Sequence, residues 1–130
     1  MPLRLVISNT SAKAIYLRFS SAKTHDFSVT DFRKKSVWQW SRGRLFAQAF
    51  QARALTANQS MVFKTGWLQK TDKRTSIPLG KYMLTAEFNA IDYAARLGPV
   101  TIDIVADKSR GLSKRFAPKA TMSLVPIFSN

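Results

Sequence analysis

Apolar side chains recur at every second position in several short segments of this chain. These positions are Leu3, Leu5, Ile7, Ile15, Leu17, Phe19, Phe27, Val29, Met61, Phe63, Tyr82, Leu84, Ala86, Phe88, Val100, Ile102 and Ile104. Because successive side chains of a β-strand point to opposite faces, each segment is predicted to form a strand with one buried face. Short, regularly spaced strands separated by polar turns are typical of an antiparallel β-sandwich. We therefore predict an all-β fold.

Two local features refine this prediction. The sequence Gly80-Lys81-Tyr82 opens a late strand and suits a tyrosine corner, in which the phenol hydroxyl bonds to nearby backbone. Residues 45–50, LFAQAF, could form a short helical turn or a strand. Periodicity does not decide between these two alternatives.

The tryptophans have two possible roles. Trp38 and Trp40 are two residues apart, so on a strand they lie on the same side. Together with Trp67 they are expected in the core of the sandwich, because large aromatic side chains dominate such cores. The alternative is that they stack on the bases of single-stranded nucleic acid next to cationic side chains.

Residues 36–50, SVWQWSRGRLFAQAF, join paired tryptophans, a Ser-Arg-Gly turn and a second aromatic segment. Together with residues 15–21, 26–31 and 78–82 and with Trp67, this segment resembles the BsuPI domain, the bacterial intracellular proteinase inhibitor family. The resemblance covers roughly residues 3–105 and depends on the order and spacing of these motifs. It implies an immunoglobulin-like sandwich and inhibition of an intracellular subtilisin-like serine proteinase.

Three predicted hairpins depart from the glycine-containing pattern of that family. They comprise residues 21–24, 31–35 and 56–60. Asn58 in the third hairpin can still adopt a left-handed conformation, because asparagine tolerates positive φ better than most residues. These departures preserve the core pattern, but they change the exposed loops on which an inhibitory function could depend.

The alternating pattern stops after Ala106. We therefore predict a sandwich domain over residues 1–106 and a C-terminal tail over residues 107–130. The first part of the tail is basic and is typical of a flexible arm, whereas residues 122–130 are largely apolar. Such an apolar end predicts a segment that docks on a partner.

The charge balance points to an anionic partner. The chain has 21 Lys and Arg against 7 Asp and Glu, a formal net charge of +14. Such a field attracts nucleic acid, acidic protein and anionic lipid alike, so charge alone does not select among them. The sequence contains no cysteine, no apolar run long enough to cross a bilayer and no recognisable signal peptide at its start. A cytoplasmic location is therefore expected.

No set of residues suggests an enzyme. His25 is the single histidine, and we expect it at the surface near a strand end. The adjacent Asp26 should point to the opposite face, so the two would form no dyad. The seven carboxylates show no catalytic or metal-binding spacing, and the glycines form no phosphate-binding loop. We predict no catalytic residue, no cofactor and no metal.

The main functional hypothesis is a basic interaction or linker subunit that binds acidic proteins within a larger assembly, such as a light-harvesting antenna. The predicted partner-binding residues are Arg33, Lys34, Lys35, Arg42, Arg44, Lys108, Arg110, Lys114, Arg115, Phe116, Lys119, Leu124, Ile127 and Phe128. The tail cations would bind carboxylates, and the apolar residues would fill a groove. One alternative is inhibition of a subtilisin-like serine proteinase, as the resemblance implies. Another is binding to RNA or the ribosome through phosphate contacts, although no RNA-binding motif is present.

Overall fold

The computed structural model describes residues 1–106, 115–116 and 120–124. This part of the chain contains strands and turns but no helix. The strands are β1 (Pro2–Ser8), β2 (Ile15–Phe19), β3 (His25–Thr30), β4 (Ser36–Gln39), β5 (Gln51–Leu55), β6 (Ser60–Gly66), β7 (Gly80–Phe88), β8 (Ala95–Ala106), β9 (Arg115–Phe116) and β10 (Ala120–Leu124). The predicted all-β, immunoglobulin-like sandwich is confirmed.

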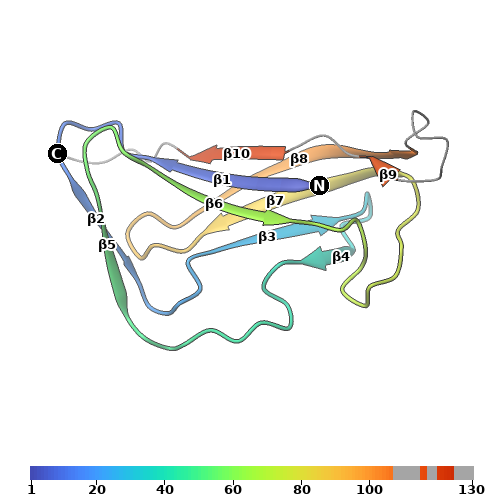
Figure 1. Cartoon of the computed structure of the whole chain (residues 1–130), viewed down its shortest axis with the longest axis horizontal. Coiled ribbons are helices and arrows are strands. Elements are labelled where there is room, and N and C mark those ends of the chain that lie inside the picture. Colours follow the sequence, from blue (N-terminus) through green and yellow to red (C-terminus); the bar gives the residue numbers. More distant parts are fainter. Residues whose placement is uncertain (107–114, 117–119, 125–130) are drawn as a thin grey trace.

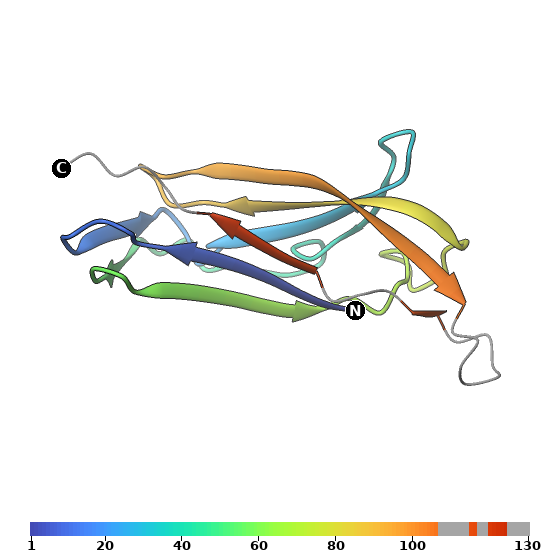
Figure 2. The same cartoon turned by 90° about the horizontal axis from the view of Figure 1, so that it is seen from above.

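The strands form two facing layers, seen apart in Figure 2, with a ribbon to one side in Figure 1. One layer is the five-stranded sheet β4-β3-β7-β8-β9, and the other is the three-stranded sheet β10-β1-β6. Strands β2 and β5 form a separate antiparallel ribbon. All pairings among the described strands are antiparallel except that of β1 with β10.

The core lies between the two layers and is built by the alternating residues. Leu3, Leu5 and Ile7 of β1 are completely buried, as the sequence pattern predicts. The rings of Phe63 in β6 and Phe88 in β7 lie 6.2 Å apart and join the two layers. Burial of each such side chain contributes roughly 1.5–3 kcal/mol, so the alternating pattern supplies most of the driving force for the sandwich.

Val100 is an exception to the alternation. Its side chain is 43% exposed, whereas Ile102 and Ile104 are buried as predicted. The register between β7 and β8 shifts beside this residue, because Leu84 pairs with Val100 but Ala86 pairs with Leu97. A bulge of this kind bends the strand and interrupts its alternation. The prediction that Val100 is buried is therefore wrong.

The tyrosine corner is present at the start of β7. The hydroxyl of Tyr82 donates a hydrogen bond to the carbonyl oxygen of Pro78 at 2.6 Å. Gly80, two residues earlier, has a φ of 141°, which L-residues rarely adopt. The glycine thus allows the sharp entry into β7 that brings the hydroxyl of Tyr82 back to the preceding loop.

The turns agree only in part with the predictions from the sequence. Asn58 has a φ of 61°, which confirms the predicted left-handed conformation, and Lys34 in the preceding hairpin has a φ of 63°. Residues 45–50 form neither a helical turn nor a strand. In Figure 1 they belong to the long connection between β4 and β5.

Two pieces of the predicted tail lie in the sheets. Strand β10 pairs with β1 in parallel, from Leu3 opposite Ala120 to Ile7 opposite Leu124, and β10 lies beside β1 in Figure 2. Strand β9 pairs with the end of β8 through Val105 opposite Phe116. These pairings occur within one chain, whereas the division at residue 106 and the docking role of the tail stay predictions.

Candidate protein-interaction site

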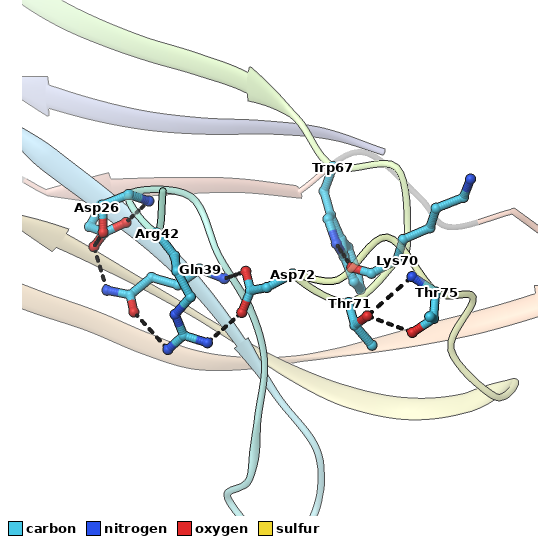
Figure 3. A network of polar contacts seen from close by, with 9 residues as sticks. Asp26, Gln39, Arg42, Trp67, Lys70, Thr71, Asp72 and Thr75 are labelled. Atoms are coloured by element: carbon cyan, nitrogen blue, oxygen red, sulfur yellow. Dashed lines mark hydrogen bonds and ion pairs between the residues drawn. The ribbon is translucent and has the colours of Figure 1, made fainter. Parts of the chain in front are cut away.

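A buried carboxylate organises the turn that follows β4. Asp26 on β3 is 0% exposed. Its carboxylate accepts hydrogen bonds from the Ser41 hydroxyl at 2.6 Å and the Gln39 amide group at 2.7 Å, and from the backbone N–H groups of Ser41 and Phe27 at 3.1 and 2.9 Å. The Lys23 ammonium lies 3.2 Å from it. The turn is therefore tied to the core through one side chain (Figure 3).

A second carboxylate closes the free edge of β4. The backbone N–H of Asp72 donates to the carbonyl oxygen of Val37 at 3.2 Å, and its carboxylate accepts the N–H of Gln39 at 3.1 Å. Arg42 forms an ion pair with the same carboxylate (Figure 3). Since an open edge invites pairing with other strands, Asp72 protects β4 by occupying its outward-facing groups.

His25 lies in the core rather than at the surface. Its ring is stacked between the rings of Trp40, 4.6 Å away, and Phe63, 4.3 Å away. The residue is only 9% exposed, and its Nδ1 is 2.9 Å from the Thr24 hydroxyl. The expectation of a surface histidine is wrong, because aromatic residues from the turn after β4 and from β6 cover the start of β3.

Burial lowers the pKa of His25 from 6.5 to about 4. The charge of Asp26 opposes this shift, and the charges of Arg53 and Arg44 add to it. The histidine is consequently neutral near pH 7. A neutral imidazole can be buried between two aromatic rings without the desolvation cost that a charged imidazolium would carry.

We expect His25 to make the fold sensitive to mild acid. The unfolded chain binds a proton near pH 6.5 and the folded chain only near pH 4, so the free energy of unfolding should fall as the pH drops through this window. The expected loss is about 2 kcal/mol between pH 7 and pH 4, below the full linkage value because solvent still reaches part of the ring. Urea unfolding at pH 7, 6, 5 and 4 measures it. His25→Phe should remove most of this slope, and an unchanged slope would contradict the assignment.

The three tryptophans pack as the core hypothesis predicts, to different depths. Trp67 is 1% exposed, and its indole N–H donates to the carbonyl oxygen of Lys70 at 3.0 Å. Trp38 stacks on Trp67 with ring centroids 5.8 Å apart. Trp38 and Trp40 are partly buried and pack against the core cluster. The two tryptophans near β4 thus form the boundary between the core and the surface.

Residues 44–50 form an exposed apolar segment whose first part is held by Trp40. The Arg44 guanidinium lies 4.5 Å from the Trp40 ring centroid, and its Nε donates to the Trp40 carbonyl at 2.9 Å. The Phe46 ring lies 5.8 Å from the same indole. Leu45 stands between these two contacts and is 101% exposed. The protein therefore presents an apolar side chain to solvent from a segment that is fixed on both sides of it.

A cleft of about 650 Å³ lies between β4 with its following turn and the loop after β6. Trp38, Trp40 and Trp67 contribute to its walls. Its charged lining residues are the cations Arg42, Arg44, Lys70 and Arg74 and the single acid Asp72. The cleft therefore carries an excess of positive charge beside aromatic walls.

The predicted partner-binding residues occupy separate places. Arg42 and Arg44 line the cleft, whereas Arg33, Lys34 and Lys35 are exposed on the hairpin at the other end of β4. Arg115 and Phe116 belong to β9, and Leu124 to β10. The predicted residues Lys108, Arg110, Lys114, Lys119, Ile127 and Phe128 lie outside the described residues.

Sequence reasoning missed several residues of this region. Leu45, Lys70, Asp72 and Arg74 were not among the predicted site residues. Lys70, Asp72 and Arg74 lie about 30 residues from Arg42 and Arg44, and no motif connects the two segments. The one available signal was the apolar run that starts at Leu45 directly after the Ser-Arg-Gly turn.

Residues 1–93 match the sequence model of the BsuPI family, described as intracellular proteinase inhibitor. No curated protein matches the chain. Among solved structures, it is similar to one described as the crystal structure of FlgD from Xanthomonas campestris, with insights into the hook capping essential for flagellar assembly. The identity is 17%, the coverage is 80% of this chain and 71% of that one, and the TM-score is 0.35. The family match contains β1 to β7, the exposed segment and the cleft.

Proposed function

Because this chain belongs to the BsuPI family of intracellular proteinase inhibitors, we propose that it inhibits a subtilisin-like serine proteinase in the cytoplasm. The family match over residues 1–93 is the observation that carries this proposal. It includes every residue of the exposed segment and of the cleft described above. In the described part of the chain, no helix is both long and apolar enough to span a bilayer.

The segment at residues 44–50 is the best candidate for contact with the proteinase. An inhibitor must offer a stretch of chain that fits a substrate cleft, and it binds tightly only if that stretch loses little freedom on binding. The two contacts with Trp40 and a hydrogen bond from the Ala22 N–H to the Ala47 carbonyl at 2.9 Å restrict this segment. Leu45 is free to enter an apolar specificity pocket.

Titration of a purified intracellular subtilisin-like proteinase tests the proposed function. With a chromogenic peptide substrate and a fixed enzyme concentration, we expect activity to fall linearly and to approach zero near one equivalent of inhibitor. The complex should persist on size-exclusion chromatography at physiological salt. Either of two results would contradict the proposal. One is proteinase activity that stays unchanged at a tenfold molar excess of the protein. The other is rapid cleavage of the added protein with no delay in turnover of the chromogenic substrate.

A second candidate function is a basic interaction or linker subunit for acidic proteins of a larger assembly, such as a light-harvesting antenna. The net charge of +14 favours it, because such a field accelerates encounters with anionic surfaces. The residues of the predicted tail could take part in such contacts. Native purification followed by identification of the proteins and RNA that co-migrate distinguishes this function from proteinase inhibition and from binding to RNA.

A further inference from the structure

We propose that the cleft beside β4 binds a carboxylate-rich segment of a partner protein. This site adjoins the exposed segment assigned to the proteinase and shares Arg44 with it, but Lys70 and Arg74 lie outside that segment. It consists of two parts of the chain, the turn after β4 and the loop after β6, which meet across the tryptophans. The inference holds whether or not the protein inhibits a proteinase.

The cleft contains more cations than acids, and most of these cations are free of ion pairs within the described residues. Of its four cations, Arg42 is neutralised by its ion pair with Asp72. Lys70 and Arg74 have no ion-pair partner among the described residues, and both are exposed. Arg44 covers the Trp40 ring and likewise has no carboxylate partner there. The cleft therefore offers several cationic donors to an incoming anion, and cation-to-carboxylate hydrogen bonds are among the stronger ones.

The tryptophans favour a peptide over a nucleic acid as the ligand. Base stacking requires a free aromatic face. The Trp40 indole is already in contact with the His25 ring, whose centroid is 4.6 Å away, and with the Arg44 guanidinium, which lies 4.5 Å from the Trp40 centroid. Trp67 is almost completely buried. Trp67 is therefore closed to a base, and a base could reach Trp40 only by competing with groups that already contact it, so both indoles act as walls of the cleft.

The peptide would be recognised by side chains and not by strand addition. The outward-facing N–H of Gln39 and carbonyl of Val37 on β4 are already bonded to Asp72. Specificity would therefore depend on the spacing of the cations relative to the carboxylates of the partner. Cations placed in this way fix the register of the partner in addition to contributing affinity.

The loop that carries Lys70 and Arg74 is held in place before any ligand arrives. The hydroxyls of Thr71 and Thr75 are 2.6 Å apart (Figure 3). The Thr71 N–H donates to the Thr75 carbonyl at 2.8 Å. The Arg74 N–H donates to the Thr71 carbonyl at 2.8 Å, and Lys70 and Ser76 form a β-bridge. Because the backbone is closed in this way, binding would cost mainly the freedom of the cationic side chains.

A matched pair of double variants tests the inference. Lys70→Gln with Arg74→Gln removes two cations from the cleft, and Arg33→Gln with Lys35→Gln removes the same residue types from the hairpin at the other end of β4. The probe is a fluorescently labelled hexaglutamate peptide, measured by anisotropy in the full-length protein at low salt. We expect the cleft variant to bind about tenfold more weakly than the wild type. The hairpin variant should stay within about threefold, because it changes only the general field.

Three outcomes would overturn the proposal. An equal loss of affinity in the two variants would show that the peptide responds to net charge alone. Absence of binding by the wild type would show that the cleft does not bind a carboxylate-rich peptide. Tighter binding of an oligothymidylate with the same number of charges, weakened by the cleft variant, would assign the cleft to nucleic acid. Thermal unfolding of both variants controls for folding, and the proteinase titration should be unaffected by the cleft variant, which separates this site from the inhibitory one.

Discussion

Replacing Asp26 with alanine is expected to lower the free energy of unfolding by about 3–5 kcal/mol. The carboxylate is fully buried, and its removal leaves the N–H groups, amide and hydroxyl of Phe27, Gln39 and Ser41 without their acceptor. Buried donors without an acceptor have given up their hydrogen bonds to water on folding and gain none in return. The Lys23 ammonium would lose its partner as well. Urea unfolding followed by tryptophan fluorescence at pH 7 measures the change.

The matched control for this variant is Asp92→Ala. Asp92 forms an ion pair with Arg18, but both side chains are about half exposed, at 52% and 49%. Exposed ion pairs contribute roughly 0–1 kcal/mol, so this variant should be nearly as stable as the wild type. Comparable losses in the two variants would mean that burial of Asp26 has no special energetic role and would contradict the structural argument.

Acid should remove the contribution of Asp26. Burial raises the pKa of this carboxyl group, but hydrogen bonds from Ser41, Gln39 and Lys23 and the charge of Lys23 outweigh burial and lower it below 3.8. The folded chain therefore releases this proton more readily than the unfolded chain does. The resulting stabilisation is present above about pH 4 and is lost as the pH falls through the lowered pKa. It thus lies below the window in which His25 acts.

The sandwich was predictable because its main signal is local. Leu3, Leu5 and Ile7 alternate with less buried neighbours, and the structure buries all three. A two-residue period depends only on strand geometry and on one apolar layer, so it can be recognised without knowing which strands pair. The tyrosine corner at Tyr82 was predictable for the same reason, since donor and acceptor are four residues apart.

His25 and Asp26 could not be placed from the sequence because their surroundings come from distant segments. His25 is covered by Trp40 and by Phe63, which is 38 residues away. Asp26 is satisfied by a turn that begins beyond β4. A polar residue near a strand end is usually exposed, and only tertiary contacts can reverse that expectation.

The cleft could not be predicted from the sequence for the same reason, because its two walls come from distant segments. Arg42 and Arg44 were recognised as cations beside the tryptophan strand, but nothing in the sequence places Lys70 and Arg74 opposite them. That juxtaposition depends on Asp72, which bonds to β4 through both its backbone and its carboxylate. The bonds of Asp72 therefore hold the loop after β6 against the edge of the sheet.

Replacing Leu45 with glutamate is expected to weaken inhibition of the proteinase by about 10²- to 10³-fold. The prediction depends on the proposed inhibitory function. A fully exposed apolar side chain between two anchored neighbours is the group that would be desolvated in the proteinase cleft, and a charge there would have to be buried without a partner. The inhibition constant, obtained from steady-state assays over a range of inhibitor concentrations, measures the effect.

Leu79→Glu serves as the control, because Leu79 is also exposed but lies in the loop before β7. Both variants should keep the stability of the wild type within about 0.5 kcal/mol, since exposed side chains contribute little to folding. A selective loss in Leu45→Glu would then reflect contact with the proteinase and not unfolding. If the wild type inhibits and Leu45→Glu inhibits equally well, residues 44–50 are not the contact segment, although the chain would still be an inhibitor. If Leu79→Glu loses as much as Leu45→Glu, the added charge acts at long range, and the assignment of the contact to Leu45 fails.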